Sequence, residues 1–129
     1  MGHDSQVVVV VDDDAAVRHA LKFALESEGL KIRVHGNGRA LLSDSQLGLY
    51  ACLVIDYRMP DIDGLELVDM LRSRGVMAPV ILITGRANAA MRERAARVGV
   101  GTILEKPLAD GALSAAVHAA LAPPPATPT

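Results

Sequence analysis

The stretch VVVVVDDDAAVRHALKFALESE, from Val7 to Glu28, changes its apolar period partway along. The five consecutive valines have the length and β-branched composition of a buried strand. After three aspartates, apolar residues recur at helical spacing: Val17, Leu21, Ala24 and Leu25. The stretch therefore predicts a strand over 7–11 and a helix over 15–28 that buries these four side chains on one face.

The same change of period recurs along the rest of the chain. Further short β-branched runs predict strands at Ile32–Val34, Leu53–Ile55, Val80–Ile83 and Thr102–Leu104. A segment with helical spacing of its apolar residues follows each run: Arg39–Gln46, Leu65–Arg74, Ala89–Val98 and Ala112–Leu121. The helical pattern is weakest in the first of these four segments. Three of the five helices are followed by a glycine, the residue expected in a left-handed conformation after a helix end: Gly29, Gly75 and Gly99.

Repeated strand–helix units predict parallel strands joined by right-handed crossovers, with helices on both faces of one sheet. The strand runs are continuously apolar, as in strands buried on both sides. A closed eight-stranded barrel needs about twice this chain length, so an open doubly wound α/β sheet is expected. The 129 residues and 13.6 kDa suit a single domain over 7–121. Residues 1–6 are expected to be a flexible start, and the proline-rich 122–129 a tail or linker.

Composition excludes several classes of protein. The chain carries 13 basic and 15 acidic residues, for a net charge of -2, which argues against nucleic-acid binding by this chain alone. Its longest aliphatic run, Val7–Val11, is far shorter than the ~20 residues of a membrane span. Met1–Gln6 has no secretory pattern, so a soluble cytoplasmic domain is expected. The single Cys52 excludes a disulfide framework and is expected to be a small core residue.

Polar residues follow four of the five predicted strands. Asp12, Asp13 and Asp14 follow the first strand, Asp56 the third, Thr84 the fourth and Lys106 the fifth. Each has a structural explanation by itself: Asp14 suits a helix N-cap, for example. Open α/β sheets, however, bind ligands at the carboxyl ends of their strands. We therefore expect these side chains to share one edge of the sheet.

The charges at this edge point to phosphoryl chemistry. Two carboxylates about 4 Å apart repel by ~4 kcal/mol at an effective dielectric constant of 20. Asp12, Asp13 and Asp56 would therefore need cations beside them, and Lys106 supplies only one. Hard oxygen ligands with room for water suit Mg²⁺. A carboxylate beside Mg²⁺, a hydroxyl and an ammonium group can accept a phosphoryl group as an acyl phosphate.

Four strings carry a family resemblance: VVDDD (10–14), VIDYRMPDIDGLEL (54–67), ILITG (81–85) and LEKP (104–107). Together they resemble the receiver domain of bacterial two-component response regulators, and the nearest subgroup looks like the FixJ type. The resemblance covers about residues 7–121. It implies a flavodoxin-like, CheY-like fold with five parallel strands in the order 2-1-3-4-5.

The resemblance assigns roles to the residues at the strand ends. It implies that Asp56 receives a phosphoryl group from a sensor histidine kinase or a phosphotransfer protein. Asp13 would bind Mg²⁺ directly, with Mn²⁺ as a substitute, and Asp12 would do so mostly through water. Asp56 and the backbone carbonyl of Arg58 would complete the protein ligands. The protein would thus be a signalling switch and not an enzyme acting on external substrates.

Further positions match the family pattern. Thr84 would hydrogen-bond to the phosphoryl group and move toward it on activation, and Lys106 would pair with a phosphoryl oxygen. The Lys106–Pro107 peptide is often cis in the family, in keeping with the low cost of a cis bond before proline. Pro60 and Gly64 would shape the loop beside the site.

Other positions leave alternatives open. Most receivers have an aromatic residue where this chain has Ile103, so the relay of the signal is either impaired or carried by backbone shifts. Arg58 and Arg86 would tune the lifetime of the phosphorylated state or be solvated surface charges. A phosphate-independent binding module is one alternative function. A small α/β phosphohydrolase is another, and it would need Glu105 as a second acid or base.

The family also implies an interaction surface. A homodimer would form through the face made by the helix 89–98, the strand 102–104 and the helix 112–121. Any DNA-binding output would need a domain beyond this chain.

Overall fold

The structure, a computed structural model, describes residues 6–122, so the expectations for 1–6 and 122–129 fall almost wholly outside the described residues. It contains one five-stranded parallel sheet with the strand order β2-β1-β3-β4-β5. The strands are β1 (Val7–Val11), β2 (Lys31–His35), β3 (Cys52–Asp56), β4 (Val80–Thr84) and β5 (Thr102–Glu105). This order confirms the expected topology.

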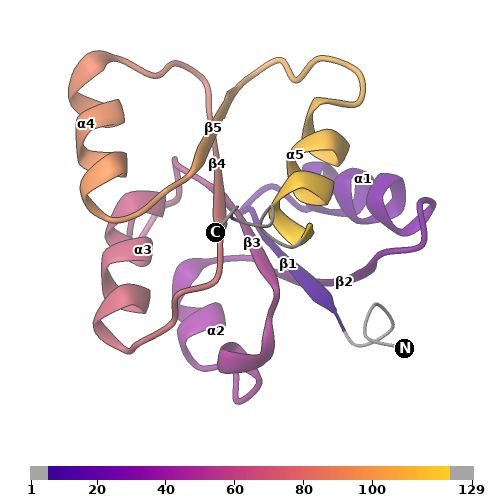
Figure 1. The fold of residues 1–129 in the computed structure, drawn as a ribbon, viewed down its shortest axis with the longest axis horizontal. Coiled ribbons are helices and arrows are strands. Elements are labelled where there is room, and N and C mark those ends of the chain that lie inside the picture. Colours follow the sequence, from indigo (N-terminus) through magenta and orange to yellow (C-terminus); the bar gives the residue numbers. More distant parts are fainter. Residues whose placement is uncertain (1–5, 123–129) are drawn as a thin grey trace, which may run out of the picture.

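Helices cover both faces of the sheet (Figure 1). They are α1 (Ala15–Glu26), α2 (Gly38–Leu42), the short 3-10 helix η2 (Leu47–Leu49), α3 (Gly64–Ser73), α4 (Ala89–Arg97) and α5 (Ala112–Leu121). Helices α1 and α5 lie on one side, and α2, α3 and α4 on the other (Figure 1). The doubly wound arrangement is therefore as predicted. Among residues 6–122, no helix combines the length and the apolar character that a membrane span requires.

The continuous valine run of β1 is explained by two separate cores. Val9 and Val11 pack into the cluster beneath α2, α3 and α4. Val8 and Val10 pack into the cluster beneath α1 and α5. All four are fully buried, and burying one such side chain stabilises the fold by about 1.5–3 kcal/mol. Successive residues of one strand thus anchor opposite layers, which fixes the register of the sheet.

Local signals set most helix ends. Side-chain oxygens cap the N-termini of four helices: Asp14, Asn37, Asp63 and Asn88. At α3 the carboxylate of Asp63 and that of Glu66 form a reciprocal capping box. The glycines after α1, α3 and α4 have positive φ, as predicted: Gly29, Gly75 and Gly99.

Two helices differ from the sequence prediction. The helix expected over 39–46 ends at Leu42, because Asp44 turns its carboxylate to the Gln46 backbone N–H and to the side chains of His35 and Tyr50. The hydrogen bond from Tyr50 lowers the pKa of Asp44 to about 2. Helix α1 ends at Glu26 instead of 28.

The buried stripe of α1 is also narrower than predicted. Leu25 is buried, whereas Val17 and Leu21 are half-buried and Ala24 is exposed. Ala24 instead lines a solvent-accessible groove of about 220 Å³ between α1 and the segment that leads into α5. The methyl group of Ala24 therefore contributes little to the core.

Candidate functional site

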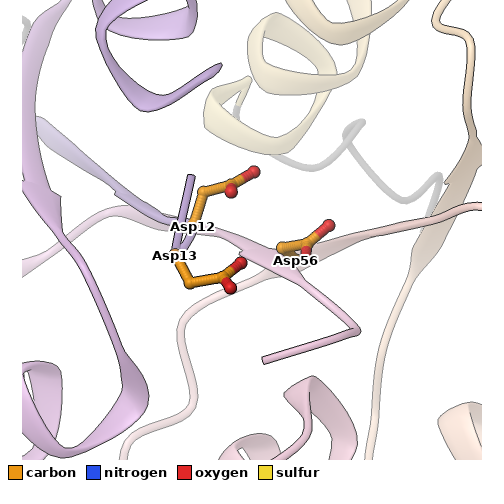
Figure 2. A group of neighbouring side chains, drawn as sticks. All are labelled: Asp12, Asp13 and Asp56. Atoms are coloured by element: carbon orange, nitrogen blue, oxygen red, sulfur yellow. The ribbon is translucent and has the colours of Figure 1, made fainter. Parts of the chain in front are cut away.

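Three aspartates meet at the carboxyl end of the sheet (Figure 2). Asp12 and Asp13 directly follow β1, and Asp56 is the last residue of the adjacent strand β3. One carboxylate oxygen from each of the three lies within 4.8 Å of the others. Asp12 and Asp56 are buried, while Asp13 is exposed. The pairing of Val11 with Ile55 brings these strand ends side by side, so parallel register alone assembles the cluster.

Asp12 is held from two sides. Its Oδ1 accepts a hydrogen bond of 2.9 Å from the backbone N–H of Asp14. Its backbone carbonyl accepts one of 2.7 Å from Nη1 of Arg18. Burial raises the pKa of the Asp12 carboxyl above its ordinary value, and the negative charges of Asp56 and Asp13 act in the same direction.

Arg18 was not among the residues predicted for this site. The available signal was its position, because side chains in a helix lean toward the N-terminus. A long cation one turn into α1 can therefore reach back to the end of β1.

Lys106, which directly follows β5, joins the cluster. Its Nζ lies 2.8 Å from Oδ1 of Asp56, and its backbone N–H donates to the carbonyl of Thr84 at 2.8 Å. The hydrogen bond to the Asp56 carboxylate raises the pKa of Lys106, which keeps the ammonium group charged. One ammonium group beside three carboxylate groups does not balance their negative charge. The donor set, all carboxylate oxygen and partly open to solvent, fits a hard divalent cation.

Thr84 is the buried last residue of β4. Its Oγ1 donates a 3.3 Å hydrogen bond to the backbone carbonyl of Arg86, two residues further on. The hydroxyl is therefore engaged by the loop that follows β4.

The other predicted site residues occupy different environments. Arg58 and Arg86 are exposed, and Ile103 is half-buried against the core beneath α2, α3 and α4. The peptide bond between Lys106 and Pro107 is cis.

The structure also shows why residue 64 is a glycine. A Cβ atom on Gly64 would lie 2.7 Å from the backbone carbonyl oxygen of Asp56. The Gly64 N–H donates to the Tyr57 carbonyl at 2.8 Å, so the start of α3 touches the end of β3. The expected role of Gly64 in shaping this loop has a steric basis.

Glu105, which the hydrolase alternative requires as an acid or base, has other partners. Its Oε2 accepts a 2.7 Å hydrogen bond from the backbone N–H of Ala87 and lies 3.9 Å from Nη2 of Arg92. The carboxylate is thus engaged with the loop after β4 and with α4. The parallel register accounts for this proximity in part, since Glu105 lies opposite Thr84 across the two strands.

A doubly wound α/β sheet with an acidic cluster and a lysine at its carboxyl edge defines the class of protein. The chain matches the response regulator receiver domain family over residues 8–118, and it belongs to that family. It is 42% identical over 118 residues to the transcriptional regulatory protein FixJ of Azorhizobium caulinodans, covering 92% of this chain and 56% of that protein. FixJ of Bradyrhizobium diazoefficiens is 35% identical over 115 residues, covering 88% of this chain and 56% of that protein.

Solved structures agree with this assignment. The structure described as FixJ-N superposes with a TM-score of 0.80 at 32% identity, covering 90% of this chain and 93% of that chain. The response regulator StyR gives a TM-score of 0.84 at 32% identity, covering 91% of this chain and 59% of that chain. The chain spans about half the length of the curated relatives that it matches. It is therefore a response regulator receiver domain of the two-component type, with a FixJ-like and CheY-like fold.

Proposed function

We propose that this receiver domain accepts a phosphoryl group on Asp56 from a phosphohistidine of a sensor kinase or a phosphotransfer protein. A carboxylate oxygen of Asp56 attacks phosphorus, the phosphorus–nitrogen bond breaks, and its electron pair returns to the imidazole, which takes up a proton. The observation that carries the proposal is the position of Asp56. It lies between two further carboxylates and the Lys106 ammonium group, 2.8 Å away.

The residues around Asp56 would have two separate roles, metal binding and pairing with the phosphoryl group. Asp12, Asp13, Asp56 and the backbone carbonyl of Arg58 would hold Mg²⁺, or Mn²⁺ in its place. The bound ion would supply positive charge to the phosphoryl oxygens. Lys106 is already paired with Asp56, and in the phosphorylated state it would pair with a phosphoryl oxygen.

A single phosphoryl group on Asp56 would shift an equilibrium between two conformations. Charge-assisted hydrogen bonds from Thr84 and Lys106 to that group would contribute about 1.5–3 kcal/mol each, or roughly 3–6 kcal/mol together, less the contribution of the bonds they now make to the Arg86 carbonyl and to Asp56. Moving an equilibrium between two states from 1:99 to 99:1 takes about 5.5 kcal/mol. The domain would therefore act as a switch for protein–protein contacts, including a homodimer through α4, β5 and α5. Arg58 and Arg86, exposed beside the site, would tune the lifetime of the phosphorylated state.

The test is phosphoryl transfer from acetyl phosphate, followed by intact mass. We expect the wild type to gain one phosphoryl group only with Mg²⁺, and Asp56→Asn to gain none. Asp61→Asn is the matched control, because it removes an exposed carboxylate from the loop that follows β3, and this carboxylate pairs with Arg39 instead. This control should label like the wild type.

The opposite results are equally informative. Labelling of Asp56→Asn at the wild-type level would show that another residue is the acceptor. If the wild type takes up no phosphoryl group and also fails to bind beryllofluoride with Mg²⁺, the domain is a phosphate-independent binding module. Repeated turnover of a phosphomonoester would instead support the hydrolase.

A further inference from the structure

Glu105 connects the two strand ends that the proposed switch uses. It is the last residue of β5 and directly precedes Lys106, which contacts Asp56. Its side chain reaches the loop between β4 and α4, where it accepts the Ala87 backbone N–H at 2.7 Å. That loop directly follows Thr84, the last residue of β4. One carboxylate therefore ties the loop after the hydroxyl of Thr84 to the end of β5, which the ammonium group of Lys106 follows.

The direction of the side chain follows from strand geometry. Alternate residues of a strand point to the same face, so Glu105 shares a face with Ile103. Ile103 packs into the cluster that contains Ala95 of α4, which places this face of β5 toward α4. Glu105 accordingly also lies near α4, with its Oε2 3.9 Å from Nη2 of Arg92.

The hydrogen bonds within the loop describe one particular arrangement. Oγ1 of Thr84 is bound to the Arg86 carbonyl at 3.3 Å, and the next residue, Ala87, donates to Glu105. A hydroxyl that turns to a phosphoryl group on Asp56 has to leave the Arg86 carbonyl. Because the two hydrogen bonds involve adjacent residues of a short loop, that movement also strains the bond between Ala87 and Glu105.

We propose that Glu105 is a positioning residue that latches the loop between β4 and α4 in its unphosphorylated arrangement and passes its release to α4. This inference rests on the proposed function of Asp56. Ile103 has no polar group with which to bind the loop, whereas Glu105 contacts both the loop backbone and α4. The Ala87 hydrogen bond carries most of the effect. The Arg92 pair is long and half-exposed, and exposed ion pairs contribute little.

The experiment compares Glu105→Ala, which removes both contacts, with Glu105→Gln, which keeps an oxygen for the Ala87 N–H. Glu93→Ala is the matched control, since Glu93 is an exposed carboxylate on α4 that pairs with Arg97 at 3.1 Å. Two quantities are measured: the affinity for beryllofluoride with Mg²⁺, and the hydrogen-exchange rate of the Ala87 amide with and without that phosphoryl mimic.

We expect Glu105→Ala to bind beryllofluoride about tenfold more tightly than the wild type, because the latch no longer opposes the bound state. Glu105→Gln should stay within about twofold of the wild type. In the wild type, beryllofluoride should speed exchange of the Ala87 amide, whereas in Glu105→Ala this exchange should be fast from the start.

Several results would overturn the latch. Equal affinities of the wild type and Glu105→Ala would do so, as would an Ala87 exchange rate in the wild type that beryllofluoride leaves unchanged. The same gain in beryllofluoride affinity in Glu93→Ala would show that the effect comes from the loss of a surface negative charge and not from the contacts of Glu105. A wild type that binds no beryllofluoride would instead remove the proposed function of Asp56, and the latch with it.

Discussion

Gly64 shows how closely one residue can be tied to the candidate site. A Cβ at this position would lie 2.7 Å from the carbonyl oxygen of Asp56 and 3.0 Å from Cα of Tyr57. Both neighbours are backbone atoms of the segment that carries the proposed phosphoacceptor. They cannot turn aside as a flexible side chain would, so added volume must displace the end of β3 or the start of α3.

We therefore expect Gly64→Ala to lower the free energy of unfolding by about 1–3 kcal/mol, the usual cost of overpacking. It should also slow phosphorylation by acetyl phosphate, since Asp56 moves with its backbone. Urea denaturation and intact mass measure the two effects. Gly48→Ala is the control, because a Cβ there meets nothing within 4 Å. If both variants unfold at the same urea concentration, the close approach at Gly64 does not affect the free energy of unfolding.

At this scale the sequence predicts which residues gather but not how they are oriented. Asp12, Asp56 and Lys106 could be placed together because parallel strands end at one edge of the sheet. The hydrogen bond from Thr84 to the Arg86 carbonyl depends on a rotamer and on loop geometry, neither of which leaves a pattern in the sequence. The contact of Arg18 with the Asp12 carbonyl was missed for another reason, since its position one turn into α1 allowed it but did not distinguish it from other helix cations.

At the scale of elements, Arg72 connects the C-terminal ends of α3 and α4. From α3 its guanidinium group donates to the carbonyls that follow α3 and to those at the end of α4. The acceptors are Val76 at 2.9 Å, Ala78 at 2.9 Å, Val98 at 3.0 Å and Gly99 at 3.0 Å. These carbonyls lie where the chain leaves a helix and has no repeating backbone partner. Arg72 thus satisfies four backbone acceptors with one planar group.

Replacing Arg72 with methionine keeps the apolar length of the side chain but leaves these carbonyls without their donor. We expect the free energy of unfolding to fall by about 2–4 kcal/mol, because hydrogen bonds to charged groups each contribute about 1.5–3 kcal/mol and some carbonyls will recruit water. Arg97→Ala should change it by less than about 0.5 kcal/mol, since its pair with Glu93 is exposed. Chemical denaturation of both variants measures the difference. If both variants lose the same free energy of unfolding, the hydrogen bonds of Arg72 to these carbonyls do not stabilise the fold.

Element types were readable from the sequence where the apolar period was long and regular. The five strands and four of the helices stand within a few residues of their predicted positions. The helix expected over 39–46 was shortened because Asp44 binds His35 and Tyr50, which come from β2 and from just before β3. These contacts depend on the tertiary fold, so the local spacing of apolar residues does not predict them.

At the scale of the whole molecule, the stable core and the cluster of mutually repelling carboxylates belong to the same sheet. The buried residues of β1 and β3 stabilise both layers of the core, and their ends hold three carboxylates within 4.8 Å. Repulsion among these charges lowers the stability of the protein without a metal ion. Any cation that binds the folded state alone must therefore raise its stability by mass action.

Asp13→Asn tests this balance, because Asp13 is the exposed member of the cluster and its replacement leaves the core intact. Without divalent ions we expect Asp13→Asn to be more stable than the wild type by about 0.5–1 kcal/mol, through relief of repulsion. Saturating Mg²⁺ should raise the Tm of the wild type by several degrees, as about 2.7 kcal/mol follows from a ligand at 100 times its Kd. The variant should gain much less.

Asp14→Asn separates this effect from a general loss of charge. Asp14 caps α1 through hydrogen bonds from the N–H groups of Ala16 and Val17, and asparagine is an equally good cap. It removes the same charge one residue further along, outside the cluster of three. Differential scanning calorimetry with EDTA and with Mg²⁺ should show a wild-type response in Asp14→Asn. If Asp13→Asn responds to Mg²⁺ as the wild type does, the cation does not bind at this cluster, because the variant has lost one of the three ligands that define it.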